Sequence, residues 1–181
     1  MTGPRIIAMT AAHIGQVADI EAMVSDRVSE RPWSAATFLS ELRHSDRCYV
    51  TAWPDDEGSD RLLGYGGVRT MLDEAHITTV AVDPGWQRRG IGGHLMVALM
   101  QAALRSPATA ATLEVRATNL AAQRLYSRFG FAPVGVRPRY YSATAEDAII
   151  MWVHDIDTPD YANRLAVAQT RLTAPSTAVR N

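Results

Sequence analysis

The fold is decided by residues His76–Gly93, HITTVAVDPGWQRRGIGG. The first seven of these residues are rich in Val, Ile and Thr and stop at Asp-Pro-Gly, a pattern typical of a buried strand that runs into a turn. From Ile91 to Ala103, apolar residues recur at every fourth position, which predicts a helix with one buried face. We therefore predict a strand, a glycine-rich turn and a helix in direct succession.

The turn between this strand and this helix has the composition of an anion site. The first N–H groups of a helix have no partners within the helix, and they lie at the positive end of its dipole. Gly90 and Gly92 let the backbone approach a phosphate closely, and Arg88 and Arg89 supply guanidinium groups that pair with phosphate oxygens. The spacing matches neither the P-loop nor the dinucleotide-binding fingerprint, so both are excluded. A helix cap without a ligand remains the alternative.

Composition limits the classes of protein to which the chain can belong. Its 181 residues suit one domain, with 47% hydrophobic residues to fill a core and a net charge of −1 that gives no general attraction to nucleic acid or to acidic membranes. The single cysteine, Cys48, excludes an internal disulfide and a multi-cysteine metal cluster, and its apolar neighbours favour a small buried residue over a reactive thiol. No signal peptide or membrane-spanning run is recognisable, so we expect a cytoplasmic protein without a membrane partner.

The order of the remaining patterns predicts an α/β layer fold. Helices interleaved with strands indicate a mixed central sheet of about six to seven strands, parallel at its centre, with helices on both faces. Glycines within the strand 62–71 suggest a bulge or a close approach by another element. The predicted order is a strand (5–9), helices starting after Thr10 and Ser34, strands (48–53, 62–71, 76–82), a helix after Gly90, a strand (110–115), a helix between Asn119 and Gly130, and two closing strands (131–136, 148–153) joined by 137–141 and a polar loop.

The C-terminal residues have a different pattern. Thr158-Pro159-Asp160 begins a weak helical repeat that Ala174-Pro175-Ser176 ends, and we expect a disordered terminus beyond it. We therefore divide the chain into a domain of residues 1–155 and an extension of residues 156–181. The pattern leaves open whether the helix docks on its own domain or on another subunit.

Two residues near the second strand–helix unit are candidates for acid–base chemistry. Glu114 lies between Leu113 and Val115 in a predicted central strand, so it points to the opposite face, where a carboxylate needs a reason. That reason is either catalysis or a salt bridge to Arg116. Tyr126 lies about 100° round its helix from Leu125 and is therefore expected beside the core stripe, either donating a proton or exposing its hydroxyl to water.

Several segments resemble the GNAT N-acetyltransferases. Gln87-x-x-Gly90-x-Gly92, after a strand that ends in Val-Asp-Pro, is similar to their acyl-coenzyme A site, and Asn119-x-x-Ala122-x-x-x-Tyr126-x-x-x-Gly130-Phe131 is similar to their second conserved segment. LEVR (113–116), Arg139-Tyr140-Tyr141, DAIIM (147–151) and Pro32-Trp33-Ser34 are similar to the RimI-type subfamily, which acetylates the N-terminal alanine of a small-subunit ribosomal protein. The resemblance covers residues 5–155.

This resemblance implies the GNAT fold and direct transfer from acetyl-coenzyme A, without a metal and without an acyl-enzyme. Glu114 matches the general base and Tyr126 the general acid. Gly93 departs from the family, which often has a basic or polar residue there, so one phosphate contact is expected to be missing. The cofactor-binding positions implied are Val80, Ala81, Val82, Gln87, Arg88, Arg89, Gly90, Ile91, Gly92, Gly93 and Asn119.

The implied acceptor is the N-terminus of a protein or peptide, a ribosomal protein above all, enclosed by Trp33, Tyr140 and Tyr141. A positive charge on the peptide could meet Glu30 or Glu41, and the alternative is that the aromatic residues only close the core. An α-amine, with a pKa of about 7.7–8.0, is easier to deprotonate than lysine at about 10.4, which favours the N-terminus mildly. Acetylation of lysine or of small amines, and binding of acetyl-coenzyme A without catalysis, remain open. We expect a monomer or weak dimer with no direct nucleic-acid partner.

Overall fold

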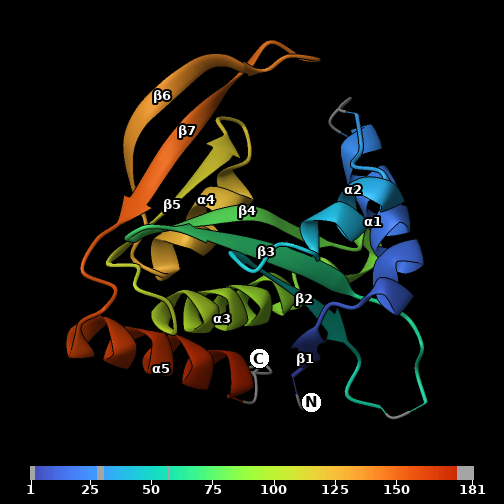
Figure 1. Ribbon diagram of the computed structural model, residues 1–181, viewed down its shortest axis with the longest axis horizontal. Coiled ribbons are helices and arrows are strands. Elements are labelled where there is room, and N and C mark those ends of the chain that lie inside the picture. Colours follow the sequence, from blue (N-terminus) through green and yellow to red (C-terminus); the bar gives the residue numbers. More distant parts are fainter. Residues whose placement is uncertain (1–2, 28–30, 57, 175–181) are drawn as a thin grey trace, which may run out of the picture.

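The computed structural model describes residues 3–27, 31–56 and 58–174, and these form one seven-stranded sheet covered by helices (Figure 1). The strand order is β1-β2-β3-β4-β5-β7-β6, and β4 and β5 are parallel whereas the other pairs are antiparallel. The predicted mixed sheet and its parallel centre are therefore confirmed. The strands are β1 (Arg5–Ala8), β2 (Arg47–Trp53), β3 (Gly64–Met71), β4 (Glu74–Val82), β5 (Ala110–Arg116), β6 (Ala132–Tyr141) and β7 (Glu146–Val153). The helices are α1 (Ile14–Arg27), α2 (Ala35–Glu41), α3 (Ile91–Leu104), α4 (Leu120–Arg128) and α5 (Pro159–Thr173).

Helices cover both faces of the sheet, because side chains along each strand alternate between two cores. Val50 and Ala52 of β2 belong to the core that contains α3, whereas Tyr49 and Trp53 belong to the core that contains α1. Figure 1 shows α1 and α2 on one side of the sheet and α3 on the other. The stripe predicted from Ile91 to Ala103 is buried along its length.

The glycines of β3 serve both purposes that the sequence suggested. The register between β3 and β4 shifts at Gly67/Val68, so the strand contains a bulge. A Cβ atom at Gly66 would lie 2.9 Å from Leu99 Cδ1, and one at Gly67 would lie 2.3 Å from the Tyr49 ring. The absence of side chains here therefore lets α3 and β2 pack directly on the strand.

The segment 137–141 does not form the predicted connecting loop. β6 continues to Tyr141, with a second register shift between Arg137 and Tyr141, and the connection to β7 is only residues 142–145. Because β6 is an edge strand, Pro138 removes no hydrogen bond that the sheet needs. The result is a long hairpin that rises above the rest of the sheet (Figure 1).

The C-terminal helix docks on its own chain. Tyr161 and Leu165 of α5 are buried in the same core as α3, and the Tyr161 hydroxyl donates a hydrogen bond of 3.0 Å to the carbonyl of Phe129. Leu172 packs beside Gly93. The terminus for which we expect disorder, residues 175–181, lies outside the described residues.

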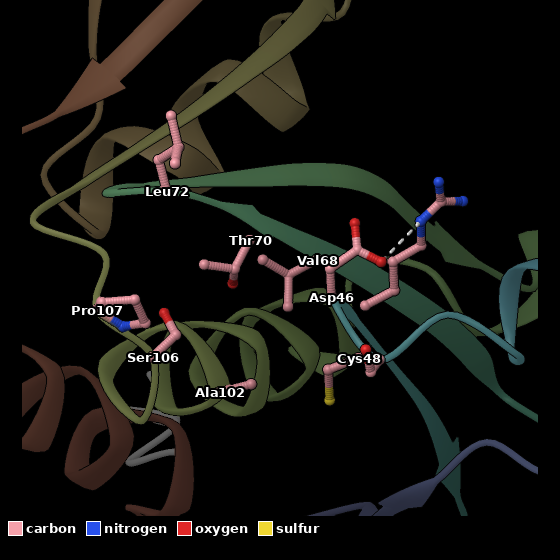
Figure 2. A pocket seen from close by; sticks show the side chains of 10 residues that line it. Asp46, Cys48, Val68, Thr70, Leu72, Ala102, Ser106 and Pro107 are labelled. Carbon is pink, nitrogen blue, oxygen red and sulfur yellow. Dashed lines mark ion pairs between the residues drawn. The ribbon is translucent and has the colours of Figure 1, made fainter.

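A cavity of about 410 Å³ lies between β2, β3 and the C-terminal end of α3, and Cys48 is one of its lining residues (Figure 2). Cys48 is half-buried and packs against the core, and burial raises the pKa of its thiol. A thiol held in its protonated form is a poor nucleophile. This environment agrees with a packing role for Cys48.

Candidate active site

The parallel strands β4 and β5 separate soon after they begin to pair. Their register covers only Glu74–His76 against Ala110–Thr112, although β4 continues to Val82 and β5 to Arg116. Within the described residues, no β-ladder joins the two strands beyond this point. The carboxyl ends of neighbouring parallel strands are where ligands bind in α/β sheets. Here the backbone of β4 from residue 77 onward pairs with β3 on one side only.

The glycine-rich turn follows β4 directly, and its backbone is left-handed at two positions. Gly90 has φ +83° and forms the N-cap of α3 without a capping side chain. Arg88 is also left-handed, with φ +59°. In the first turn of α3, Gly93 and His94 donate to the carbonyl of Gly90. The N–H groups that precede them stay at the positive end of an uncapped helix.

The predicted cofactor residues from Val80 to Gly93 lie together at the end of β4, and the polar side chains of Gln87 and Arg89 already make contacts within the protein. Gln87 Nε2 donates to the carbonyl of Val82 at 3.3 Å. The guanidinium of Arg89 lies over the Trp86 ring, 4.6 Å from its centroid. Arg88 and Arg89 are both exposed beside the turn. A row of strand amides, a glycine turn and two exposed guanidinium groups fit a long ligand that carries phosphates.

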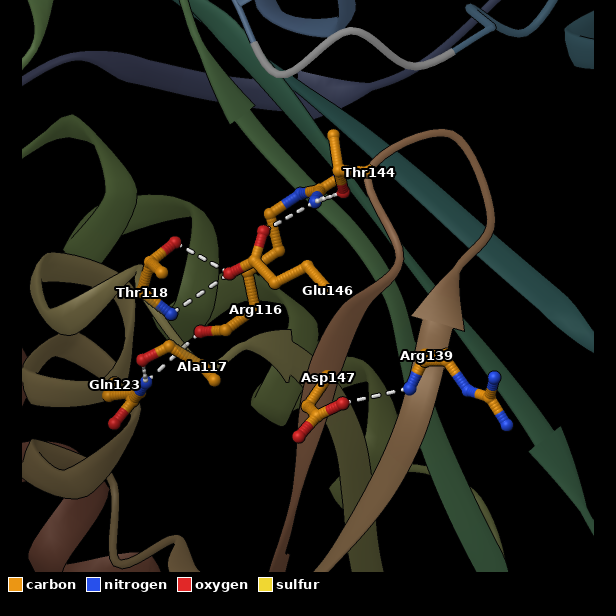
Figure 3. Close-up of polar contacts among 8 residues, drawn as sticks. All are labelled: Arg116, Ala117, Thr118, Gln123, Arg139, Thr144, Glu146 and Asp147. Atoms are coloured by element: carbon orange, nitrogen blue, oxygen red, sulfur yellow. Dashed lines mark hydrogen bonds and ion pairs between the residues drawn. The ribbon is translucent and has the colours of Figure 1, made fainter.

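Asn119 caps α4 as predicted, accepting a hydrogen bond of 3.0 Å from the Ala122 amide. It stands at the end of β5, where a polar network joins three elements (Figure 3). Arg116 Nη1 donates to Glu146 Oε2 at 2.6 Å, and Glu146 also accepts from the amide and hydroxyl of Thr118. The hydrogen bonds from Thr118, then the Arg116 charge, hold the pKa of the Glu146 carboxyl below its ordinary value. The network fixes the start of α4 against the β6–β7 hairpin.

Glu114 lies between Leu113 and Val115, which belong to the α3 core, so its side chain points to the opposite face of the sheet, where it is only 9% exposed. Its partners are His76, with Nε2 2.7 Å from Oε2, and Arg137, with Nη1 3.2 Å from Oε1. The salt bridge to Arg116 that the sequence allowed is not formed, because Arg116 pairs with Glu146 instead. A carboxylate offers about four lone-pair sites, so two contacts leave capacity for a water molecule or an amine.

Tyr126 lies on the core face of α4 and not beside the core stripe, which corrects the position expected from its spacing to Leu125. Ala121 is exposed, whereas Tyr126 is 8% exposed and its ring lies 6.2 Å from that of Phe131. Burial raises the pKa of the Tyr126 hydroxyl above its ordinary value, and the nearby Tyr141 adds to this effect. The hydroxyl therefore keeps its proton and does not point into bulk water.

A cavity of about 610 Å³ surrounds Glu114 and contains the aromatic residues predicted for the acceptor end. Trp33, whose backbone amide donates to Glu21 at 3.1 Å, comes from the segment before α2, and Tyr140 and Tyr141, edge-to-face at 5.2 Å, come from the end of β6. Trp33 and Tyr140 are 37% and 46% exposed, so they do not simply close the core.

Of the two acidic residues predicted to meet a positive charge on the peptide, only Glu41 lies within the described residues. Glu41 lines the same cavity, but it forms an ion pair with Arg47 and accepts a hydrogen bond of 2.7 Å from the Tyr49 hydroxyl. Glu30 lies outside the described residues. Glu41 is therefore already neutralised, and a cationic side chain would have to compete with Arg47 for it.

Sequence reasoning missed His76 and Arg137, the two residues that hold Glu114. His76 is the first residue of the predicted apolar strand, and the register of two parallel strands has no local signal. Arg137 belongs to the predicted connecting segment, whereas the extended β6 strand brings it to the carboxylate. The one signal in the sequence is that the two neighbouring strands each carry a polar residue among apolar ones, His76 in β4 and Glu114 in β5.

Metal ligation finds no support in residues 3–27, 31–56 and 58–174, where no cluster of three or more His, Cys, Asp or Glu side chains is suitably placed. In the same ranges, none of the helices has the length and apolar character needed to cross a bilayer.

Residues 16–131 match the model of the acetyltransferase (GNAT) family. The N-alpha-acetyltransferase RimI of Mycobacterium tuberculosis is 37% identical over 148 residues, which cover 80% of this chain and 88% of that protein. An uncharacterized protein of Mycobacterium leprae is 38% identical over 147 residues, but these cover 79% of this chain and only 38% of that protein. The crystal structure of the ribosomal-protein-S18-alanine N-acetyltransferase from Escherichia coli has a TM-score of 0.70 at 30% identity and covers 84% of this chain and 94% of its own.

Proposed function

The chain belongs to the GNAT acetyltransferase family, and we propose that it acetylates the α-amino group of a protein N-terminus, as RimI-type enzymes do. It is an acetyl-coenzyme A-dependent N-acetyltransferase. The acceptor we propose is a ribosomal protein that begins with alanine, because the Escherichia coli protein of similar structure is named for that reaction on S18. Such an acceptor would be met in the cytoplasm.

Acetyl-coenzyme A supplies the acetyl group as a thioester, and the residues around the β4–β5 opening suit its different parts. The backbone groups of Val80–Val82 that do not pair with β3 can pair with the amide groups of the pantetheine arm. The uncapped start of α3 at Gly90, with Arg88 and Arg89, suits the pyrophosphate. Asn119, at the end of β5, lies at the same edge of the sheet.

Glu114 acts as the general base in this proposal. His76 and Arg137 hold its carboxylate, which accepts the proton from the incoming ammonium group directly or through one water molecule. His76 is 41% exposed, so it can pass that proton to solvent. At neutral pH an α-amine needs about 3.5 kcal/mol less than lysine to lose its proton. One positioned carboxylate is sufficient help for such an amine.

Tyr126 acts as the general acid. Its buried hydroxyl keeps its proton and can donate it to the sulfur that leaves the acetyl group. A tyrosine of raised pKa is a weak acid, but a thiolate in the same apolar surroundings is also disfavoured, so the two groups remain matched. The chain needs no covalent acyl-enzyme, and Cys48 lines a different cavity from Glu114.

The observation that carries this proposal is the placement of Glu114 between the separating strands, inside a cavity walled by Trp33, Tyr140 and Tyr141. Aromatic rings on both sides form a slot suited to the end of a peptide chain. Acetylation of a panel of peptides that differ in their first three residues tests it. We expect peptides that begin with alanine or another small residue to react fastest, and equal rates across the panel would contradict an enclosed N-terminus.

A further inference from the structure

A groove of about 620 Å³ runs between α4 and α5, and three arginines lie among the apolar side chains that line it. Arg128 comes from α4, and Arg164 and Arg171 come from α5. Asp160, at the start of α5, is the single carboxylate among the lining residues. No ion pair or hydrogen bond of the three guanidinium groups is found among the described residues, and three arginines against one aspartate leave the groove with a net positive charge.

This groove begins at the glycine-rich turn. Leu172 of α5 occupies the space beside Gly93, where an added Cβ atom would lie 2.7 Å from Leu172 Cδ2. The same leucine lies 3.8 Å from the Cβ position of Gly90. Gly93 is therefore the residue that lets α5 approach the start of α3. Arg171, the neighbour of Leu172, is consequently carried to the edge of the proposed pyrophosphate site.

The ligand proposed for that site has a further anionic group close by. Coenzyme A carries a phosphate on the 3′-oxygen of its ribose, only one sugar away from the pyrophosphate. Guanidinium groups bind phosphate through parallel hydrogen bonds. If the pyrophosphate lies at Gly90, the 3′-phosphate must lie near the turn, and the groove offers unpaired cations there.

We propose that α5 is part of the cofactor site and that Arg171 and Arg164 bind the 3′-phosphate of coenzyme A. This inference rests on the proposed use of acetyl-coenzyme A. It assigns a role to a helix outside residues 16–131, the part of the chain that matches the family model. It also explains Gly93, a position where the family often has a basic or polar residue. Leu172 fills the space beside Gly93, and arginines of α5 supply positive charge instead.

The test compares acetyl-coenzyme A with 3′-dephospho-acetyl-coenzyme A by calorimetric titration of the full chain. Wild-type protein should bind the phosphorylated ligand about tenfold more tightly, since charge-assisted hydrogen bonds to one phosphate are lost in the other ligand. R171Q and the double variant R164Q/R171Q should lose most of this preference, with little change in affinity for the dephospho ligand. Higher ionic strength should reduce the preference in wild-type protein and have little effect in the double variant.

R43Q is the matched control, because Arg43 is an exposed arginine just after α2, outside the residues that line the groove. It should keep the wild-type preference. Thermal unfolding of each variant should match wild type, since the substituted side chains are exposed. Equal affinity of wild type for the two ligands, or a preference retained by the folded double variant, would overturn the role of α5 and leave the proposed function intact. A wild-type protein that binds neither ligand would contradict the proposed function as well.

Discussion

His76 Nε2 lies 2.7 Å from Glu114 Oε2, and this contact spans the two parallel strands just where they separate. His76 belongs to the last register pair, with Thr112, and Glu114 is two residues further along β5. The carboxylate is thus fixed at the apex of the opening. Arg137 holds its other oxygen from the β6–β7 hairpin. The proposed base is therefore oriented by residues from two other strands before any substrate binds.

Replacing Glu114 with glutamine should lower kcat by about 10²- to 10⁴-fold, the usual contribution of a positioned base. Affinity for acetyl-coenzyme A should change little, because Glu114 lies in the acceptor cavity. Activity of the variant should rise between pH 7 and pH 9, as an α-amine with a pKa of about 7.7–8.0 deprotonates without help. Steady-state rates over this pH range, with calorimetry of the cofactor, are the measurement. A variant at full speed at pH 7 would give the carboxylate a structural role only.

Replacing His76 with leucine should lower kcat by roughly tenfold, because the carboxylate loses a hydrogen bond that orients it. H76Q keeps an N–H donor at a similar reach and should recover part of the loss. The cofactor dissociation constant should stay constant in both variants, which separates an effect on the base from a general loss of structure. Equal kcat values in wild type and H76L would show that Glu114 does not depend on His76.

The elements with a strong local pattern could be predicted from the sequence. Several predicted features depend only on neighbours in the chain, and all of them are present. They are the stripe of α3, the caps at Ser34 and Asn119, the helix start at Thr158-Pro159-Asp160 and the stop at Gly130. Thr37 donates to Ser34 Oγ at 3.1 Å, for example, as an N-cap requires. The seven strands also follow the predicted order.

Features that depend on distant contacts could not be predicted. Pro138 and the charged residues beside it resemble a loop, and only their place at the sheet edge allows a strand. Whether Tyr126 lies in the core or beside it depends on where the sheet lies against α4. The partners of Glu114 depend on strand register and on a hairpin far along the chain. The local sequence pattern therefore predicts the positions of the helices and strands better than it predicts the contacts of the residues around the site.

Replacing Gly90 with alanine should weaken cofactor binding and lower the free energy of unfolding. At φ +83° a side chain costs roughly 1–2 kcal/mol, and the turn must relax away from the geometry that exposes its N–H groups. Gly15 in α1 has open space around it and a helical backbone, so G15A is a control that should keep wild-type affinity. Chemical denaturation and calorimetry measure the two effects. Unchanged affinity in a folded G90A protein would place the anion site elsewhere.

Replacing Tyr161 with phenylalanine should lower the free energy of unfolding by about 1 kcal/mol at neutral pH, because the hydrogen bond to the Phe129 carbonyl is lost in a buried site. Burial also raises the pKa of Tyr161 in the folded protein, so its contribution to stability is complete below about pH 10 and declines as pH rises further. The stability difference between wild type and Y161F should therefore shrink above about pH 10. Thermal unfolding from pH 7 to pH 11 measures it, and a constant difference would contradict this assignment.

The central claim is that the enzyme acetylates an α-amine held beside Glu114, and one measurement tests it most directly. A peptide that begins with alanine and also contains lysine is incubated with the enzyme and acetyl-coenzyme A, and fragment-ion mass spectrometry locates the acetyl groups. We predict acetylation of the N-terminal alanine, with loss of the reaction in E114Q at pH 7 and little acetylation of lysine. Acetyl groups found mainly on the lysine side chain, or a free polyamine that reacts faster than any peptide, would contradict the claim.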